Sequence, residues 1–398
     1  MSDKFRSVLV LVIVQTMVLS LWFVSAAIIA DLKQYEISAF ARAALSSSVQ
    51  AGFVLGALLV AVSGIADKWD PRLVLGVSAL AAALSSIALL FVAPGSTSAI
   101  GFRFATGLFL AGVYPVGMKI AVGWGVADRG FLVGLLVGGL TIGSASSHLV
   151  AYFGGADWRL TIMVASGLAM LGAAMMSLVR LGPHHRAARS FSAQAVRVVW
   201  QDRRIQAAYG GYLGHMWELY AMWAWLSVAL TASFANQVDD AGQFAKLVTF
   251  IAIAVGGIAS AVAGKLADRI GKARLAILAM LLSLISALAF AVCFGGPVLL
   301  VSAIAIFWGL VIVPDSAQFS ALIADFSPPE QAGSIMTLQT ALGFALTAVT
   351  VQLAPVVADY CGWPIVMAAL ALGPLFGIIS MRRLWKLEGT NQTPARTL

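Results

Sequence analysis

The chain has 398 residues, of which 61% are hydrophobic and only 11% are charged. A water-soluble core cannot bury so large an apolar surface, so this composition excludes a soluble globular protein and predicts a polytopic membrane protein. The formal net charge is +8, but the basic residues are spread over many short segments, which excludes a concentrated nucleic-acid-binding surface.

Long apolar runs predict the transmembrane elements, because each crossing needs about 20 apolar residues and a backbone in lipid must satisfy its own hydrogen bonds. The first half of the chain contains six such runs, near residues 7–30, 43–65, 73–93, 99–122, 131–153 and 159–181. Six more runs lie near residues 206–234, 245–266, 275–295, 297–323, 333–357 and 364–384. The sequence therefore predicts an all-α membrane protein with twelve transmembrane helices.

These runs form two sets of six, which predicts two six-helix bundles. We expect an amino-terminal bundle at residues 1–181, a cytoplasmic linker at 182–204, and a carboxy-terminal bundle with a short cytoplasmic tail at 205–398. The first run follows Lys4 and Arg6 and could instead be a signal peptide. It is longer than a usual apolar signal region, so we interpret it as a mature helix.

Lys and Arg residues predict the orientation of the chain. Most of them fall in the two terminal segments, the central linker and the even-numbered loops, whereas the opposite loops hold only Lys33, Arg42, Arg159 and Lys246. Positive charge marks the cytoplasmic side, so we expect both termini inside a bacterial plasma (inner) membrane.

A charged turn occurs once in each half of the chain. Ala66-Asp67-Lys68, followed by Arg72, returns as Gly264-Lys-Leu-Ala267-Asp268-Arg269-Ile-Gly271-Lys272-Ala-Arg274. Other landmarks repeat at nearly the same interval of roughly 200 residues, namely Pro115 with Pro314, Gly130 with Gly333, and Trp158 with Trp363. Two similar bundles side by side are a recurring design of carriers, in which the substrate lies between the halves.

Two further motifs accompany the charged turns. The fourth run contains Arg103-x-x-x-Gly107-x-x-x-Ala111-Gly112, and Asp157-Trp158-Arg159 stands at the start of the sixth. Together, the turns and these motifs resemble the major facilitator superfamily of secondary transporters. The resemblance covers essentially the whole chain. It implies alternating access, and it implies that the charged turns act as a latch that holds one conformation. The latch residues are Asp67, Lys68, Arg72, Gly264, Asp268, Arg269, Gly271 and Arg274.

The first copy of the turn departs from the family pattern. Ser63 and Asp70 stand where the family usually has Gly, and Pro71 replaces a basic residue. We therefore expect the stronger latch at Asp268. The alternative is that the charges of both copies only end helices at the water interface.

The fifth run lacks the Gly-Pro pair that drug antiporters of this family usually carry. This absence disfavours drug efflux, which remains an alternative, and favours symport, uniport or small-anion exchange. Cations within the first half and histidines in both halves favour a small organic or inorganic anion as substrate, although Glu218 and Asp315 could equally hold a cation. The chain is also loosely similar to the nitrate, nitrite and cyanate carriers, but it lacks the paired arginines of nitrate carriers.

Ionisable residues inside the runs are candidates for the substrate or proton pathway, because a charge at mid-membrane costs at least about 2.5 to 3.5 kcal/mol. Glu218 and His215 lie three residues apart in the seventh run and share a helix face with Trp225. We expect Glu218 to carry a coupled proton and His215 to be its partner or a substrate donor. The alternative is that the two groups only satisfy each other inside the bundle.

The remaining pathway candidates lie in other runs: Arg103, Tyr114, Asp315, Trp22, Gln50 and His148. Arg103 either contacts substrate or protons, as the resemblance implies, or anchors helices through backbone carbonyls. Tyr114 and Asp315 adjoin the repeated prolines, which should bend their helices and free carbonyl groups.

Other classes of protein receive little support. The sequence contains no hydrolase, zinc-protease or nucleotide-loop motif, so we expect neither an enzyme nor a cofactor or metal. The expected partners are a small-molecule substrate, protons and the lipid bilayer, and we expect a monomer. A non-transporting membrane sensor remains an alternative. Cys293 and Cys361 are predicted to be buried thiols, although a bridge between them is conceivable.

Overall fold

The computed structural model describes residues 2–125, 129–155, 157–185, 194–328 and 330–391. Within these ranges, the side chains of residues 33–34, 66–67, 129–130, 261 and 388–391 lie outside the description. One predicted latch residue, Asp67, is among them. All regular structure in the described ranges is helical.

The helices of the first half belong to the predicted amino-terminal bundle. They are α1 (Asp3–Leu19), α2 (Val24–Ile28), η1 (Ile29–Tyr35), α3 (Ala39–Ser63), α4 (Ile65–Lys68), α5 (Pro71–Ile87), η2 (Ala88–Phe91), α6 (Thr97–Leu110), α7 (Tyr114–Val122), α8 (Arg129–Gly154), α9 (Trp158–Met175) and η3 (Met176–Leu178). We refer to α1 to α9 as the first bundle.

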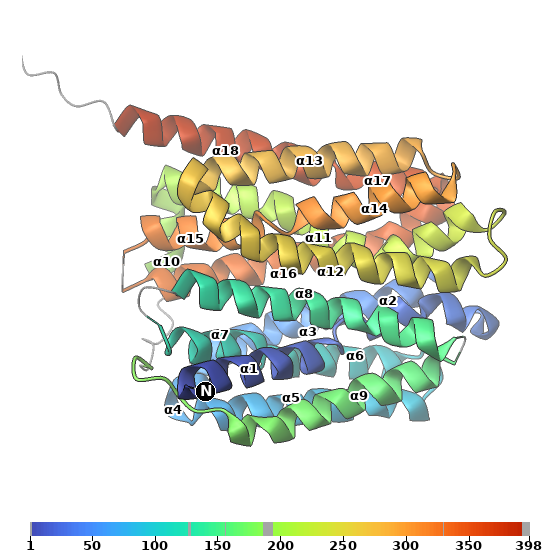
Figure 1. Cartoon of the computed structure of the whole chain (residues 1–398), viewed down its shortest axis with the longest axis horizontal. Coiled ribbons are helices and arrows are strands. Elements are labelled where there is room, and N and C mark those ends of the chain that lie inside the picture. Colours follow the sequence, from blue (N-terminus) through green and yellow to red (C-terminus); the bar gives the residue numbers. More distant parts are fainter. Residues whose placement is uncertain (1, 126–128, 156, 186–193, 329, 392–398) are drawn as a thin grey trace, which may run out of the picture.

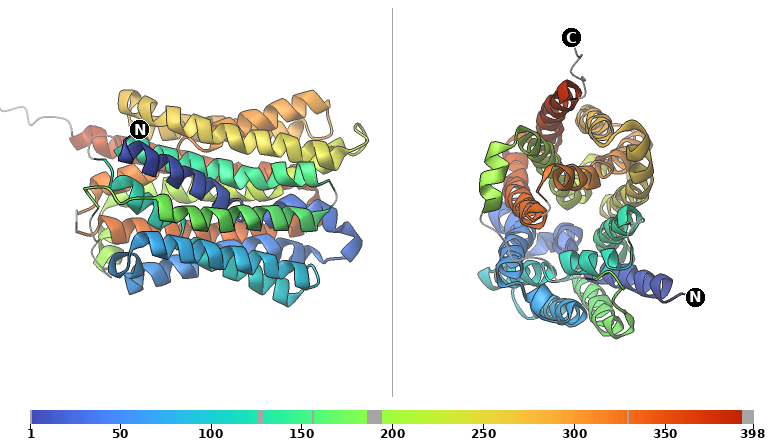
Figure 2. Two further views of the ribbon diagram at one scale, coloured as in Figure 1. Left: turned by 60° about the horizontal axis from the view of Figure 1, so that its bottom comes forward. Right: turned by 90° about the vertical axis from the view of Figure 1, so that its left-hand side faces the viewer.

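A short helix, α10 (Gln194–Gln201), precedes the helices of the second half. These are α11 (Arg203–Phe234), α12 (Ala241–Ile270), α13 (Lys272–Val292), α14 (Val298–Ile312), α15 (Ser316–Phe326), α16 (Ala332–Cys361), α17 (Trp363–Leu370) and α18 (Leu372–Asn391). We refer to α11 to α18 as the second bundle. The two bundles form two groups in the end-on view of Figure 2.

The long helices lie roughly along one direction, and both termini are at the same end of the molecule (Figure 1). We call this the terminal end, and the opposite end, where α2 and η1 lie, the far end. An even number of crossings returns a chain to the side where it started, so this placement agrees with twelve spans.

Ten helical segments are long and apolar enough to cross a membrane, and the bent pair Asp3–Leu19 and Val24–Leu32 makes an eleventh among the described residues. The twelfth crossing is α11. Its 32 residues would span about 48 Å at 1.5 Å per residue, which exceeds the thickness of a hydrocarbon core. Its many Trp, Tyr and Gly residues and its buried Glu218 and His215 explain why hydropathy alone does not select it.

Several spans are interrupted between their ends, and the twelfth has a short break at Ala371 between α17 and α18. The first bends by 50° between α1 and α2. Breaks also separate α6 from α7 just before Tyr114-Pro115, and α14 from α15 at Pro314. The two prolines therefore interrupt repeat-related spans, as the sequence predicted, because a proline removes one helical hydrogen bond and crowds the preceding turn.

The bundles meet mainly where α8 packs on α12 and where α16 packs on α3. Glycines allow the close approach of α8 and α12: a Cβ atom at Gly257 would lie 3.3 Å from the carbonyl oxygen of Gly138 and 3.2 Å from Cβ of Thr141. Small residues of this kind let helices pack backbone against backbone, and such smooth surfaces also suit relative sliding.

Candidate substrate and proton pathway

Glu218 lies inside the second bundle, with only 2% of its surface exposed. Its Oε1 accepts hydrogen bonds from Ser283 Oγ and from Trp308 Nε1, both at 2.8 Å. Trp308 Nε1 also lies 3.1 Å from Ser283 Oγ, so the three side chains form a closed set that joins α11, α13 and α14. The carboxyl group therefore points into its own bundle.

His215 pairs with Asp315 rather than with Glu218. Its Nδ1 lies 2.9 Å from Oδ1 of Asp315, and the two side chains are 1% and 3% exposed. Nε2 of His215 has no hydrogen-bond partner among the described residues. Asp315 is also close enough to Glu218 for the two carboxyl groups to interact electrostatically. We call Glu218, His215 and Asp315 the acid–histidine cluster.

The break in the tenth span positions Asp315. Pro314 ends α14, and Asp315 occupies the N-cap position of α15 without bonding to that helix through its side chain. The carboxyl group is therefore available to α11. Phe319, one turn further along α15, packs against the imidazole of His215 with ring centroids 5.8 Å apart.

Arg103 lies in the first bundle and is completely buried. Its guanidinium donates to the backbone carbonyls of Leu21 at 3.0 Å, Trp22 at 2.7 Å and Leu45 at 3.3 Å. Leu21 and Trp22 lie in the bend between α1 and α2, where carbonyls lack helical partners. The structure therefore places Arg103 as an anchor of the broken first span.

Trp22 and Gln50 come together as a pair, with Trp22 Nε1 donating to Gln50 Oε1 at 2.8 Å. The Trp22 ring also contacts the second bundle, where its centroid lies 5.4 Å from that of Phe344 and 5.9 Å from that of Tyr220. Phe53 packs on Phe344 at 4.5 Å. These rings form an aromatic contact between the two bundles.

Tyr114 is half-buried at the start of α7. Its hydroxyl lies within electrostatic range of Tyr212 and Tyr220, which belong to α11. The carbonyl of Val113, at the break, accepts a hydrogen bond from the Gly117 amide and a second one, also at 2.9 Å, from Gln15 Nε2. Tyr114 thus faces the second bundle from the broken fourth span.

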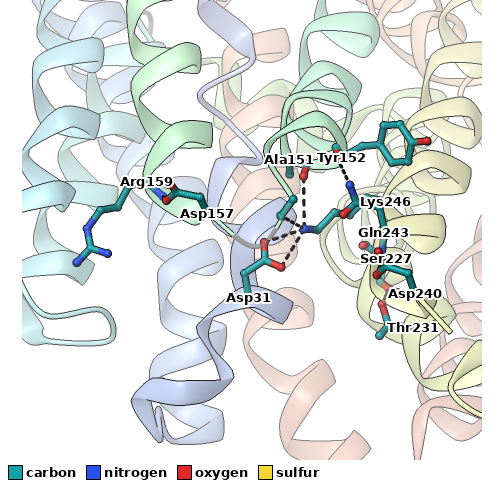
Figure 3. A network of polar contacts seen from close by, with 11 residues as sticks. Asp31, Ala151, Tyr152, Asp157, Arg159, Ser227, Thr231, Asp240, Gln243 and Lys246 are labelled. Atoms are coloured by element: carbon teal, nitrogen blue, oxygen red, sulfur yellow. Dashed lines mark hydrogen bonds and ion pairs between the residues drawn. The ribbon is translucent and has the colours of Figure 1, made fainter.

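At the far end, Lys246 of α12 links the two bundles (Figure 3). Its Nζ lies 2.8 Å from Oδ2 of Asp31 in η1 and 3.0 Å from the carbonyl oxygen of Gly155. The Lys246 side chain is 2% exposed and that of Asp31 is 12% exposed. The prediction that Lys246 lies in a solvent loop is therefore wrong, since the start of α12 packs directly on the end of α8.

Further polar contacts join the bundles at the same end. Gln243 Nε2 donates to the carbonyl of Tyr152 (Figure 3). Ser47 Oγ donates to Gln352 Oε1 at 2.6 Å, and Arg42 lies 3.6 Å from Asp359. The far end is therefore closed by contacts that must break before it can open.

The first copy of the charged turn has a local explanation for its unusual residues. Asp70 caps α5 by accepting from the Arg72 amide at 2.9 Å, and Pro71 opens that helix. Asp70 also pairs with the Arg72 side chain at 2.5 Å. This side-chain hydrogen bond lowers the pKa of the Asp70 carboxyl, against the opposing effect of burial. Lys68 is exposed.

The second copy sits at the end of α12. Gly271 ends the helix with φ of 93°, a conformation that favours glycine. Asp268, Arg269 and Gly264 are exposed within the last turns of α12. Arg274 lies over the ring of Trp385 in α18, 4.9 Å from its centroid.

The other predicted residues lie apart from the acid–histidine cluster. Trp225 Nε1 donates to the Val351 carbonyl at 3.0 Å within the second bundle. His148 is fully buried in α8, and neither ring nitrogen has a hydrogen-bond partner among the described residues. No group of three or more potential metal ligands occurs in the described part of the chain.

The cysteines are not bridged. Cys293 is half-buried and Cys361 is exposed at the end of α16, so the prediction of two buried thiols is wrong. Sequence reasoning also missed Trp308, Asp31 and Lys246. For the pairing of Asp31 with Lys246, the sequence offered one indication: the two residues have opposite charges and lie among apolar residues, at the ends of different runs.

Two packed helical bundles with interrupted spans, buried ionisable groups and a closable interface define a membrane carrier. The chain belongs to the Major Facilitator Superfamily, whose model matches residues 8–244. It is accordingly a multi-span membrane transporter and not an enzyme. No curated protein matches the sequence.

Solved structures of several transporters share this fold. A D-xylose-proton symporter is 15% identical with a TM-score of 0.76, over 97% of this chain and 98% of that one. The xylose transporter XylE from E. coli, in a partially occluded inward open conformation, is 14% identical with a TM-score of 0.75, over 100% of both chains. The nucleoside transporter NupG is 14% identical with a TM-score of 0.72, over 96% of this chain and 100% of that one. At these identities the likeness concerns the fold alone.

Proposed function

We propose that this protein is a proton-coupled secondary transporter that moves a small organic or inorganic anion by symport or uniport. It would act as a monomer in a bacterial inner membrane, with both termini in the cytoplasm. Its functional units are the bundles at residues 1–181 and 205–398, and residues 182–204 link them. In this orientation the terminal end is cytoplasmic and the far end faces outward.

The observation that carries this proposal is the acid–histidine cluster. Two carboxyl groups and an imidazole share a site inside the second bundle, and each side chain is at most 3% exposed. Charges buried in a membrane protein are costly, and they are retained chiefly where they serve an ion or substrate pathway. The D-xylose-proton symporter among the structural relatives supports proton coupling as a mode available to this fold.

Glu218 is the proposed proton carrier. Its hydrogen bonds from Ser283 and Trp308 hold one carboxyl oxygen in place, while Asp315 provides a nearby charge that depends on the state of His215. Movement of α15 against α11 would change the distance between Asp315 and Glu218. Such a change would make proton affinity differ between conformations, which is what coupling requires.

The other predicted pathway residues take supporting roles in this proposal. Arg103 holds the bent first span, while Tyr114, Trp22 and Gln50 form part of the surface between the bundles. The two charged turns act as the cytoplasmic latch, with Asp268 in the stronger copy. Asp67 lies outside the described side chains, so its role remains the one implied by the family resemblance.

The test is uptake into proteoliposomes under a pH gradient, with a panel of labelled small anions. If one proton is coupled to one substrate molecule, a gradient of one pH unit supports about tenfold accumulation of the substrate. A difference of one pH unit and a tenfold concentration ratio each correspond to about 1.4 kcal/mol. Glu218→Gln should abolish accumulation while leaving downhill exchange. The matched control is Glu330→Gln, since Glu330 is exposed at the terminal end.

Each outcome decides between functions. Accumulation by Glu218→Gln equal to that of the unaltered protein would remove Glu218 from coupling. Expulsion of cationic drugs without movement of anions would establish the efflux alternative. An absence of both driven uptake and exchange for all solutes would favour a non-transporting sensor.

A further inference from the structure

A second set of buried polar side chains lies between the bundles, away from the acid–histidine cluster. His148, Trp223 and Thr249 are each at most 1% exposed. Both ring nitrogens of His148, the indole Nε1 of Trp223 and the hydroxyl of Thr249 lack hydrogen-bond partners among the described residues. Buried polar atoms without partners cost about 1 to 3 kcal/mol each, so their presence calls for an explanation.

The packing of α8 against α12 places His148 and Thr249 at the same position along the helix axes. Gly138 faces Gly257 near mid-membrane, and the carbonyl of Ala151 faces Lys246 near the far end. The two helices therefore run antiparallel, and this register sets His148 opposite the turn that contains Thr249.

Trp223 completes the set from α11. The imidazole of His148 lies within hydrogen-bonding range of the main chain of Trp223, although the geometry falls short of a hydrogen bond. The indole ring packs on Phe23, 5.8 Å between centroids, and on Tyr220 at 5.3 Å. Both neighbouring rings meet the indole edge-on, at interplanar angles of 73° and 63°, and its N–H is left without an acceptor among the described residues.

The chemistry of these groups restricts what can satisfy them. A tryptophan N–H is a donor only, and the threonine hydroxyl and a histidine N–H can also donate. The tryptophan N–H in particular can be satisfied only by an acceptor, and the other two groups can donate to the same acceptor. The nearest charge is the ammonium of Lys246, one helical turn from Thr249, whose field reaches His148. Donors beside a cation favour an anionic acceptor over a neutral sugar.

We propose that His148, Trp223 and Thr249, together with Lys246, form a binding site for a small carboxylate. This inference rests on the proposed function, and it names a substrate class and a place for it. The carboxylate would accept from the indole N–H and the hydroxyl, and it would replace Asp31 as the counter-ion of Lys246. Binding would thereby weaken the far-end link between the bundles.

The site is closed in this structure, because its polar atoms are fully enclosed by α8, α11 and α12. Access requires that α8 and α12 separate, and the glycine contact between Gly138 and Gly257 suits such a movement. Ser144, one turn before His148 on α8, adds another buried hydroxyl without a partner at the edge of the site.

Binding to the purified full-length protein in lipid nanodiscs tests the site. Isothermal titration is carried out with acetate, pyruvate and lactate as probes and with D-xylose as the neutral comparison. We expect at least one carboxylate to bind and D-xylose to bind at least tenfold more weakly. Trp223→Phe and Thr249→Val should each weaken carboxylate binding about tenfold, since each removes one hydrogen bond to a charged group.

Matched variants separate this effect from damage to the fold. Thr249→Ser keeps the hydroxyl and should retain binding. Ser302→Ala removes an equally unpartnered buried hydroxyl from α14, and Trp217→Phe alters a tryptophan of α11 whose N–H is already bonded to the Ala369 carbonyl. Both should bind carboxylate as the unaltered protein does.

The proposal is overturned if no carboxylate binds, or if Trp223→Phe and Thr249→Val bind as well as the controls. It is also overturned if D-xylose binds as tightly as the carboxylates. Driven uptake of another solute without carboxylate binding would leave the proposed function standing and remove this site. Carboxylate binding that depends on Trp223 without any transport would leave the site standing and remove the proposed function.

Discussion

The two bundles bury ionic groups in different ways. In the first bundle, Arg103 is held by three backbone carbonyls. The second bundle has no such arginine: the interval of 199 residues that separates Pro115 from Pro314 leads from Arg103 to the small Ser302. Its buried ionisable groups are those of the acid–histidine cluster. An arginine keeps its charge under all physiological conditions, whereas carboxyl groups and histidines exchange protons. The comparison sets a permanent charge held by main-chain carbonyls, at Arg103, against a cluster of groups that can gain or lose a proton, which is what the proposed function requires of the second bundle.

The largest expected effect comes from removing the fixed charge. Arg103→Met leaves three buried carbonyls without a donor, each at a cost of about 1 to 3 kcal/mol, and should strongly lower the thermal unfolding temperature in detergent. Arg103→Lys should be intermediate, since an ammonium cannot reach all three oxygens. Arg382→Met, at an exposed position of α18, is the control. If Arg103→Met unfolds normally but no longer binds substrate, Arg103 is a ligand and not an anchor.

Breaking the contact between His215 and Asp315 should have the next largest effect. Asp315→Asn removes the carboxylate oxygen that lies 2.9 Å from Nδ1 of His215, and a buried polar group left without its partner costs about 1 to 3 kcal/mol. His215→Gln should have a similar effect, and the double variant should cost less than the two single changes together. Asp325→Asn, which removes an exposed partner of Lys272, serves as the control. Additive effects in chemical denaturation would contradict a coupled pair.

The contact of Lys246 with Asp31 joins the two bundles at the far end, and it tests whether such a buried ionic contact is permanent or breaks when the carrier opens. Lys246→Met should open the far end by about tenfold in population, the equivalent of 1.4 kcal/mol. The measurement is the labelling rate of a cysteine placed at Thr231, in a background without Cys293 and Cys361. The double variant with Asp31→Asn removes both charges and should label more slowly than Lys246→Met alone. Equal labelling in all variants would show that the link does not control opening.

The smallest effect is expected at the helix cap of the first charged turn. Asp70→Asn keeps a good capping residue but removes the ionic contact with Arg72. Because the pKa of Asp70 is lowered in the folded protein, its contribution to stability is present above the unfolded pKa of about 3.9 and is lost as the pH falls through the folded value. The difference in unfolding temperature between the variant and the unaltered protein should therefore be fully present at about pH 6 and should shrink as the pH falls below about 3.9. A difference independent of pH would contradict the ionic contribution.

Most of the architecture followed from the sequence because long apolar runs leave few alternatives in a membrane. The breaks at Pro115 and Pro314 were also predicted, since proline has a direct effect on the helix backbone. The bend between α1 and α2 contains no proline and was not predicted. It depends on Arg103, which lies some 80 residues away in the chain and supplies the missing donors.

The sequence named Glu218, His215 and Asp315 as candidate residues, but it did not predict which of their side chains contact one another. Glu218 and His215 were correctly placed deep in α11, but their spacing of three residues suggested a mutual contact. In the folded chain their side chains diverge around the helix: His215 points toward α15, and Glu218 points toward α13 and α14. Such partners lie 65 to 100 residues further along the chain, so local spacing cannot select them.

The low hydropathy of α11 has a consequence for how the protein is made. A helix rich in aromatic and polar residues is recognised poorly by the insertion machinery, although it can be anchored by the basic pair Arg203 and Arg204 at its start. If α11 failed to enter the membrane during synthesis, every helix after it would insert in the opposite direction. The residues of α11 that the proposed function assigns to transport therefore also make its insertion the step of biogenesis that most needs help from neighbouring helices.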